Sequence, residues 1–315
     1  MAKQNKRASA LSRAASSLEK DGLRRPGRTE PEILPTGLVK FDEALGGGLV
    51  RGRIYEVAGS EQSGKTTLAL EICRIVQEVL GLAVVYSDYE HALEFDYAKR
   101  VGVNMSKDKF LFEQPDVLED GLYVGRKFIE SGGIGVSVLD SVAGMIAKSE
   151  HENKGGAAAV ARAFGPELRK YVALLAKTQT IGIFVNQTRT TFKNWLAAET
   201  TPGGRALKFF ASVRMFCYGG KSSVEPWRKV GGLRSKMYIK KNKILGGGRG
   251  SAEYEILPDR GIVKEYEILE IAKKKELVTE RLGIYTLGSR KFRGLDKILA
   301  VMKNEEVREW ILEAE

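Results

Sequence analysis

The feature that most constrains the fold is the segment from Gly59 to Thr66, GSEQSGKT. It follows an apolar stretch of β-type residues, IYEVAG, and precedes a stretch with helical spacing from about Lys65 to Val79. A strand, a glycine-rich turn of the form GxxxxGK[ST] and a helix together indicate a phosphate-binding P-loop. Glycines let backbone amides surround phosphate oxygens, and the helix directs its positive end at the same anion. The chain is therefore expected to bind a nucleotide.

Two side chains in this segment have distinct expected roles. Lys65 should reach the β- and γ-phosphates, and the Thr66 hydroxyl should ligate Mg²⁺. ATP and Mg²⁺ are thus the expected cofactors. The segment expected to contact the nucleotide comprises Gly59, Ser60, Glu61, Gln62, Ser63, Gly64, Lys65, Thr66 and Thr67.

Two acidic residues complete the expected phosphate chemistry. Asp140 ends the apolar run VSVL, where a P-loop protein places its second metal-side carboxylate. Alternatively, an aspartate at a strand end caps the next helix. Glu90 follows the apolar run AVVYSD, and a carboxylate there can accept a hydrogen bond from the attacking water. His91 is left without a role, because a lone histidine is more often structural.

Short apolar runs alternate with amphipathic stretches through the middle of the chain. The runs IYEVAG, AVVYSD, GVSVLDS and IGIFVNQ alternate with predicted helices such as the one at about 158–177. This pattern predicts an α/β core with a mostly parallel central sheet and helices on both faces. The later runs VRMFCYGG, SKMYIKKNKI and AEYEILP have no helices between them and should extend the sheet with antiparallel strands.

The two ends of the chain differ from this core. Residues 1–30 predict a short amphipathic helix and a linker, either an oligomerisation arm that docks on a neighbouring subunit or a frayed terminus. The core is expected at 31–265. A small α+β C-terminal domain is expected at 266–315, with helices at about Glu267–Lys275 and Leu295–Leu312.

Composition excludes several classes of protein. The chain is 43% hydrophobic with no apolar run near the roughly 18 residues of a membrane span, and no leader follows Met1. Its two cysteines, Cys73 and Cys217, lie far apart and support neither a disulfide framework nor a zinc ribbon. A soluble, cytoplasmic protein without a membrane partner is expected.

Positive charge is concentrated in one part of the chain. The net charge is +11, yet Arg189–Arg249 alone holds fourteen lysines and arginines against Glu199 and Glu225. Such a segment indicates a nucleic-acid partner or, alternatively, a solvated basic face.

The motifs taken together resemble those of bacterial RecA recombinases. GSEQSGKTT, YEHAL and VLDSVA are followed by IFVNQTR, TTPGGRALKFFASVR and KKNKI in the order used by that family, and the resemblance runs from about Pro35 to the C-terminal end. It implies a RecA-like P-loop ATPase that forms a homo-oligomeric helical filament on single-stranded DNA, pairs it with double-stranded DNA and exchanges strands.

The resemblance also assigns residues around the nucleotide. It implies that Glu90 is the catalytic glutamate, that Tyr97 stacks on adenine and that Glu94 takes the adenine-edge position where bacterial members usually have aspartate. Gln187 resembles the γ-phosphate sensor. Lys241 and Lys243 resemble a pair that reaches the ATP of the neighbouring subunit.

Two DNA-binding loops are implied, at about 148–157 and 189–205. Phe192 and Trp195 in the second loop suit base stacking or, alternatively, core packing. Its spacing is one residue shorter than in the family, and the absence of an acidic extension after Glu315 suggests a phage or otherwise divergent member. The DNA-binding residues expected are Arg162, Arg169, Arg189, Phe192, Lys193, Trp195, Gly203, Gly204 and Arg205.

Two other functions fit parts of the sequence. A RecA-like hexameric motor or helicase shares the P-loop, but no cysteine quartet and no large N-terminal domain are present. A non-catalytic DNA-binding filament protein would not need the complete set of Lys65, Thr66, Glu90 and Asp140.

Overall fold

The computed structural model of the chain describes residues 16–17, 31–152, 159–193, 196–244 and 249–314, with only the backbone of 190–193 and 196–199. The chain divides into two units, Met1–Glu32 and Ile33–Glu315. Of the expected N-terminal arm only Ser16 and Ser17 are described, both helical, and the rest of 1–30 lies outside the described residues. The elements below belong to the second unit.

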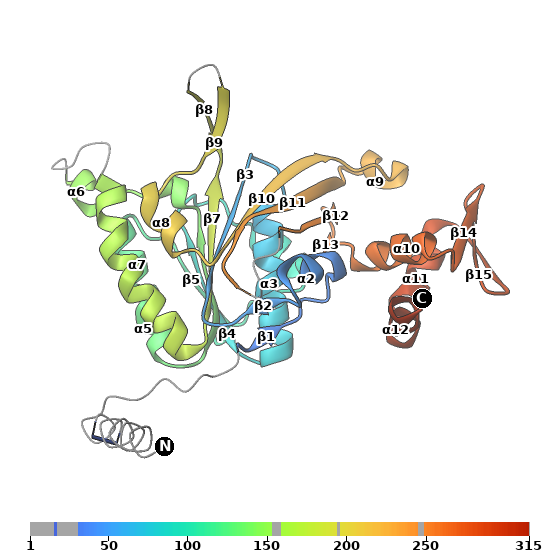
Figure 1. Ribbon diagram of the computed structural model, residues 1–315, viewed down its shortest axis with the longest axis horizontal. Coiled ribbons are helices and arrows are strands. Elements are labelled where there is room, and N and C mark those ends of the chain that lie inside the picture. The colour runs from blue at the N-terminus through green and yellow to red at the C-terminus, as the bar shows by residue number, and fades with distance from the viewer. Residues whose placement is uncertain (1–15, 18–30, 153–158, 194–195, 245–248, 315) are drawn as a thin grey trace, which may run out of the picture. The chain divides into compact units, whose positions relative to one another are not determined.

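A nine-stranded sheet forms the centre of the part of the chain that the structure describes (Figure 1). Its order is β13-β12-β11-β10-β3-β7-β6-β4-β5, and all neighbours from β10 to β5 are parallel. The remaining pairs are antiparallel, which confirms the expected extension. Its strands are β3 (Ile54–Gly59), β4 (Ala83–Asp88), β5 (Phe110–Glu113), β6 (Ile134–Asp140), β7 (Ile181–Gln187), β10 (Val213–Lys221), β11 (Leu233–Asn242), β12 (Ser251–Leu257) and β13 (Gly261–Ile262).

Helices cover both faces of this sheet because each presents an apolar side to it (Figure 1). One buried cluster joins α3 and α4 to the strands, and a second joins α5 and α7 to the opposite face. The α/β class with a mostly parallel central sheet is confirmed. The helices of this part are α2 (Val39–Leu45), α3 (Lys65–Leu80), α4 (Phe95–Val101), α5 (Leu118–Glu130), α6 (Lys148–His151), α7 (Ala159–Thr178), α8 (Gly204–Phe210) and α9 (Glu225–Lys229).

Three small sheets among the described residues lie outside the central one, two of them with two strands and one, in the C-terminal segment, with three. β1 (Ile33–Leu34) pairs with β2 (Leu49–Val50), and β8 (Arg189–Lys193) pairs with β9 (Leu196–Thr200) as an antiparallel hairpin. The expected second DNA loop is therefore largely a two-stranded hairpin, with α8 starting directly after Gly203.

The C-terminal segment has its own hydrophobic core, around Ile268, Leu299 and Ile311. Trp227 of α9 also packs in this core, with its ring 4.9 Å from that of Tyr266. Its elements are α10 (Lys264–Lys274), β14 (Val278–Arg281), β15 (Ile284–Leu287), β16 (Arg290–Arg293), α11 (Leu295–Met302) and α12 (Glu305–Glu313). The boundary at residue 265 stays a prediction.

One helix prediction was wrong. A single helix at Leu295–Leu312 is replaced by α11 and α12. The side chain of Asn304 accepts a hydrogen bond from Val307 N at 3.0 Å and so caps the second helix. A local acceptor at Asn304 thus competes with helix continuation.

No helix among the described residues is long and apolar enough to cross a membrane.

Candidate functional site

The P-loop connects the central strand β3 to α3, and two of its glycines are required by geometry. Gly64 has a φ of 86°, a left-handed conformation that glycine adopts without steric cost. A Cβ on Gly59 would lie 2.3 Å from the Cys217 carbonyl oxygen. Inside the loop, Lys65 Nζ donates to Ser60 O at 2.5 Å, and burial lowers the lysine pKa. The loop is thus a compact backbone cradle with its cation on the inside.

Asp140 and Thr66 meet beside this cradle. Thr66 Oγ1 donates to Asp140 Oδ2 at 2.9 Å, and Tyr86 OH donates to the same oxygen at 2.6 Å. Burial raises the pKa of Asp140 to about 6, against the opposing effect of these two hydrogen bonds. One carboxylate and one hydroxyl fit Mg²⁺, which binds through few protein oxygens and keeps waters and phosphate oxygens.

Glu90 is held by the side chains of Gln187, the last residue of β7, and of Ser141, the residue directly after β6. Gln187 Nε2 donates to Glu90 Oε1 at 2.9 Å, and the Ser141 hydroxyl donates to the same oxygen. Asp88 fixes the backbone of this tract, accepting from Glu90 N at 3.2 Å and Leu93 N at 3.1 Å. The structure therefore brings the expected catalytic glutamate and the expected sensor into direct contact.

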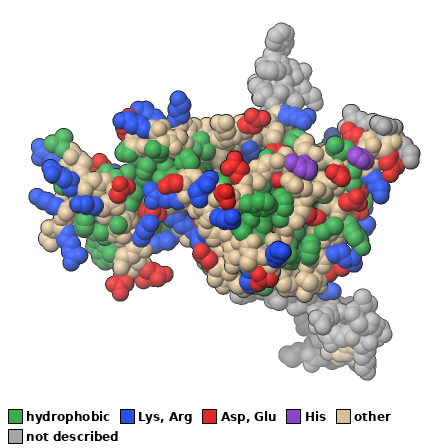
Figure 2. Space-filling view, turned by 180° about the vertical axis from the view of Figure 1, so that it is seen from behind, with side chains coloured by type: hydrophobic (Ala, Val, Ile, Leu, Met, Phe, Trp, Pro, Cys, Tyr) green, Lys and Arg blue, Asp and Glu red, His purple; other side chains and the backbone are tan. Residues whose placement is uncertain are grey.

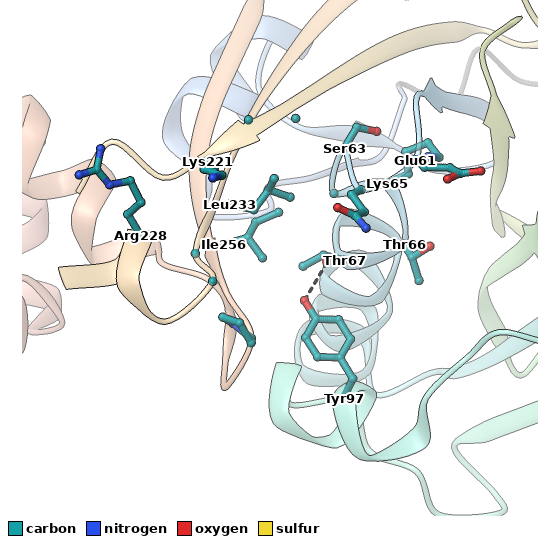
Figure 3. Close-up of a pocket in the computed structure, with 17 residues that line it drawn as sticks. Glu61, Ser63, Lys65, Thr66, Thr67, Tyr97, Lys221, Arg228, Leu233 and Ile256 are labelled. Carbon is teal, nitrogen blue, oxygen red and sulfur yellow. Dashed lines mark hydrogen bonds between the residues drawn. The ribbon is translucent and has the colours of Figure 1, made fainter. Parts of the chain in front are cut away.

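A pocket of about 930 Å³ opens beside the P-loop (Figure 3). Tyr97 closes one side of it, and its hydroxyl is hydrogen-bonded to Thr67 Oγ1 at 2.7 Å (Figure 3). The opposite wall is formed by residues for which the sequence predicted no role. They are Gly219, Gly220, Lys221, Arg228, Gly231, Gly232, Leu233, Ile256 and Pro258. Tyr97, Ile256 and Pro258 give the pocket apolar lining that suits a flat aromatic base.

The expected position of Glu94 at the base edge stays a prediction. Glu94 is exposed at the N-terminus of α4, and it is not among the described residues that line the pocket.

Lys241 and Lys243 lie against their own chain at the end of α8. Lys241 Nζ donates to Ala211 O at 2.7 Å and to Phe209 O at 3.2 Å, and Lys243 Nζ donates to Phe209 O at 3.2 Å. Burial and the neighbouring cation lower the pKa of Lys241 to about 8. Neither lysine is among the described residues that line the pocket.

Lysines and arginines are spread over the face shown in Figure 2 and are interspersed with aspartates and glutamates. The expected DNA-binding residues form two groups. Arg162 and Arg169 are exposed on α7. Arg189 begins the β8–β9 hairpin, and Gly203, Gly204 and the exposed Arg205 follow it.

Part of this prediction lies outside the described residues. Of Phe192 and Lys193 only the backbone is described, and Trp195 falls outside altogether, as do residues 153–158 of the first expected loop.

Sequence comparison decides the family. The family described as RecA N-terminal domain matches residues 9–263 of the chain. The chain belongs to the RecA family.

Individual RecA proteins match over more than three quarters of their length. Protein RecA of Syntrophus aciditrophicus is 38% identical over 298 residues, covering 90% of this chain and 85% of the relative. Protein RecA of Bacillus subtilis is 38% identical over 299 residues, with 89% and 84% covered. Protein RecA of Levilactobacillus brevis is 39% identical over 299 residues, with 90% and 77% covered.

RecA membership establishes the general activity. The chain is a DNA-dependent ATPase of DNA recombination and repair that binds ATP and DNA, and RecA proteins form filaments. The ring-forming motor and the non-catalytic filament protein are not favoured by these relatives.

Proposed function

We propose that this RecA-family chain polymerises on single-stranded DNA, samples double-stranded DNA for homology and exchanges strands. The observation that carries the proposal is the hydrogen bond of 2.9 Å between Gln187 and Glu90. Gln187 ends β7, and the chain continues within two residues into the basic β8–β9 hairpin. A change at the phosphate site therefore has a direct covalent route to a hairpin that is expected to contact DNA.

The hydrolysis step is assigned to residues on the P-loop side. The loop amides and Lys65 hold the phosphates, and Thr66 and Asp140 would hold Mg²⁺, which would neutralise charge on the phosphate oxygens. Glu90 orients the water that attacks the γ-phosphorus. A phosphorus–oxygen bond forms to this water as the bond to the β-phosphate oxygen breaks, ADP is the leaving group, and the proton of the water leaves with inorganic phosphate. Tyr97 stacks on adenine.

Filament assembly is assigned to two lysines near the end of β11 and to the N-terminal segment. We propose that Lys241 and Lys243 contact the ATP of a neighbouring subunit and that residues 1–30 dock on that neighbour. Cations supplied in trans make turnover depend on polymerisation, as arginine fingers do. The two cysteines, both free and buried, support action in the reducing cytoplasm.

DNA contact is assigned to exposed cations along α7 and the β8–β9 hairpin. Arg162, Arg169, Arg189 and Arg205 are exposed and suit phosphate contacts, which position DNA without reading its sequence. Homology is then read by base pairing.

A strand-exchange assay with purified full-length protein tests the proposal. Circular single-stranded DNA is incubated with ATP, Mg²⁺ and either homologous or heterologous linear duplex. Joint molecules are expected with the homologous duplex alone, and their yield should fall when ADP replaces ATP. Joint molecules with both duplexes, or with neither, would reject strand exchange.

A further inference from the structure

Asn186 is a fully buried amide directly before Gln187, and it contacts three parts of the chain. Its Nδ2 donates to Glu56 Oε1 at 3.0 Å and to Pro202 O at 3.1 Å, while its Oδ1 accepts from Gln187 N at 3.0 Å. Asn186 therefore links the start of the β8–β9 hairpin to the segment that follows its end.

Glu56 lies at the centre of this arrangement. It is fully buried on β3, three residues before Gly59 of the P-loop, and its other oxygen is paired with Arg214 of β10. In the sheet, β3 lies between β7 and β10, and Glu56 and Arg214 are direct register partners. A single carboxylate thus joins the strand that enters the P-loop to both of its neighbours.

The C-terminal end of the hairpin is hydrogen-bonded to Arg214 and to a lysine of α8. Arg214 Nη2 donates to Thr201 Oγ1 at 3.2 Å, and Lys208 Nζ donates to Thr200 Oγ1 at 2.9 Å. Thr200 ends β9, where it pairs with Arg189. The C-terminal end of the hairpin is consequently bonded to side chains of the central sheet and of α8, while its start follows directly from β7.

We propose that Asn186 and the Glu56–Arg214 pair form a clamp that sets the position of the β8–β9 hairpin relative to the P-loop strand and transmits DNA binding to ATP turnover. These are positioning residues, because none of them lines the nucleotide pocket in the described part of the chain. The inference rests on the proposed DNA-binding role of the hairpin. It adds a second connection to the one through Gln187.

The alternative is that the buried pair only stabilises the sheet. A buried ion pair broken by removal of one partner is strongly destabilising whatever its role. Asn186 is neutral, so changing it leaves both partners of the Glu56–Arg214 pair in place. The Asn186→Asp variant keeps the size and the acceptor for Gln187 N, but it places a carboxylate against Glu56 and removes the donor to Pro202.

The experiment compares ATP turnover with and without single-stranded poly-dT in full-length protein. For Asn186→Asp we expect the DNA-stimulated rate to fall roughly tenfold, while the rate without DNA and the affinity for a fluorescent ATP analogue change less than about threefold. Oligonucleotide affinity, measured by anisotropy, should also stay within about threefold, because the phosphate-contacting cations are intact.

In the double variant Asn186→Asp with Glu56→Gln, the amide at position 56 can donate a hydrogen bond to the carboxylate at position 186. This restores the hydrogen bond between the two positions with donor and acceptor exchanged. The double variant should recover at least about threefold of the lost stimulation under conditions where urea unfolding shows both variants to be fully folded, so that the recovery does not reflect stability alone. The matched control is Tyr171→Phe, which removes a buried side-chain hydrogen bond to Ser137 on β6. It should keep wild-type stimulation.

Should Asn186→Asp fail to fold, Thr201→Val removes the contact with Arg214 and is expected to lower stimulation about threefold. Full stimulation in the folded variants, or no recovery in the double variant, would overturn the clamp. Absence of DNA stimulation in the wild type and in Tyr171→Phe would instead reject the proposed function, and the clamp with it.

Discussion

The amide nitrogen Nε2 of Gln187 lies 2.9 Å from Oε1 of Glu90, so the residue expected to sense the γ-phosphate holds the carboxylate expected to orient water. The two come from different parts of the chain, Gln187 from the end of β7 and Glu90 from the segment after β4. A shift of either side chain therefore changes the position of the other.

Removing the charge of Glu90 tests its role in hydrolysis. The Glu90→Gln variant keeps the shape but loses the carboxylate acceptor for water, so ATP turnover should fall about 100-fold or more while nucleotide affinity stays near wild type. The control is Asp96→Asn on the neighbouring helix α4, whose exposed carboxylate is paired with Lys99 and should be dispensable for turnover. Equal losses in both variants would contradict the assignment.

The Tyr86 hydroxyl should strengthen Mg²⁺ binding by keeping Asp140 ionised. Its hydrogen bond to Asp140 lowers the pKa of that buried carboxyl, so Tyr86→Phe should raise the pKa further above about 6. Less ionised Asp140 then requires more Mg²⁺, and we expect the Mg²⁺ midpoint of ATP binding to rise several-fold at pH 6.5. Tyr55→Phe, which loses a buried hydroxyl bonded only to Val50 backbone atoms, should leave the midpoint unchanged.

Glu113 should make stability depend on pH. Burial raises its pKa from 4.5 to about 7, so between these values the folded chain holds a proton that the unfolded chain releases. Stability therefore falls as pH rises through this window. In urea unfolding, Glu113→Gln should match wild type near pH 4.5 and exceed it at pH 8 by on the order of 1–2 kcal/mol. A parallel pH profile in the two proteins would contradict this expectation.

The arginines of α7 should contribute phosphate contacts. Arg162→Ala and Arg169→Ala should each weaken oligonucleotide binding at moderate salt and reduce the slope of log affinity against log salt by about one, without changing sequence preference. Lys170→Ala is the control on the same helix, because Lys170 is paired with Glu167. If neither arginine variant lowered affinity, α7 would not lie along the DNA.

Asn304 should account for the start of α12. Asn304→Ala removes the cap on Val307 N and should cost about 1 kcal/mol of unfolding free energy, whereas Asn304→Ser should retain most of it. Thermal unfolding of the two variants provides the measurement.

Local pattern predicted the elements that carry the phosphate site. The expected strands IYEVAG, AVVYSD and IGIFVNQ are β3, β4 and β7 with the expected bounds, because runs rich in β-branched residues between glycine-rich turns favour strands. The expected helix from Lys65 ends one residue later, at Leu80. Asp140 lies next to Thr66 because the carboxyl ends of the parallel strands β6 and β3 share one edge of the sheet, and α3 starts just beyond β3.

Contacts that depend on tertiary pairing could not be predicted. The pocket wall at Gly219–Leu233 exists because β10 pairs with β3, and no local signal marks that pairing. Tyr86 and Ser141 look like ordinary strand and strand-end residues in sequence, and only the fold brings them to Asp140 and Glu90.

The bonds of Lys241 and Lys243 to the end of α8 mean that these cations already have oxygen partners within their own chain. Under the proposed arrangement, filament growth exchanges peptide carbonyls for phosphate oxygens instead of filling vacant donors. The free energy that these lysines contribute to assembly is then the difference between two hydrogen-bonded states, one with peptide carbonyls and one with phosphate oxygens. Because ADP lacks the γ-phosphate, hydrolysis favours the return of the lysines to α8, so each subunit carries an internal competitor for its neighbour's nucleotide.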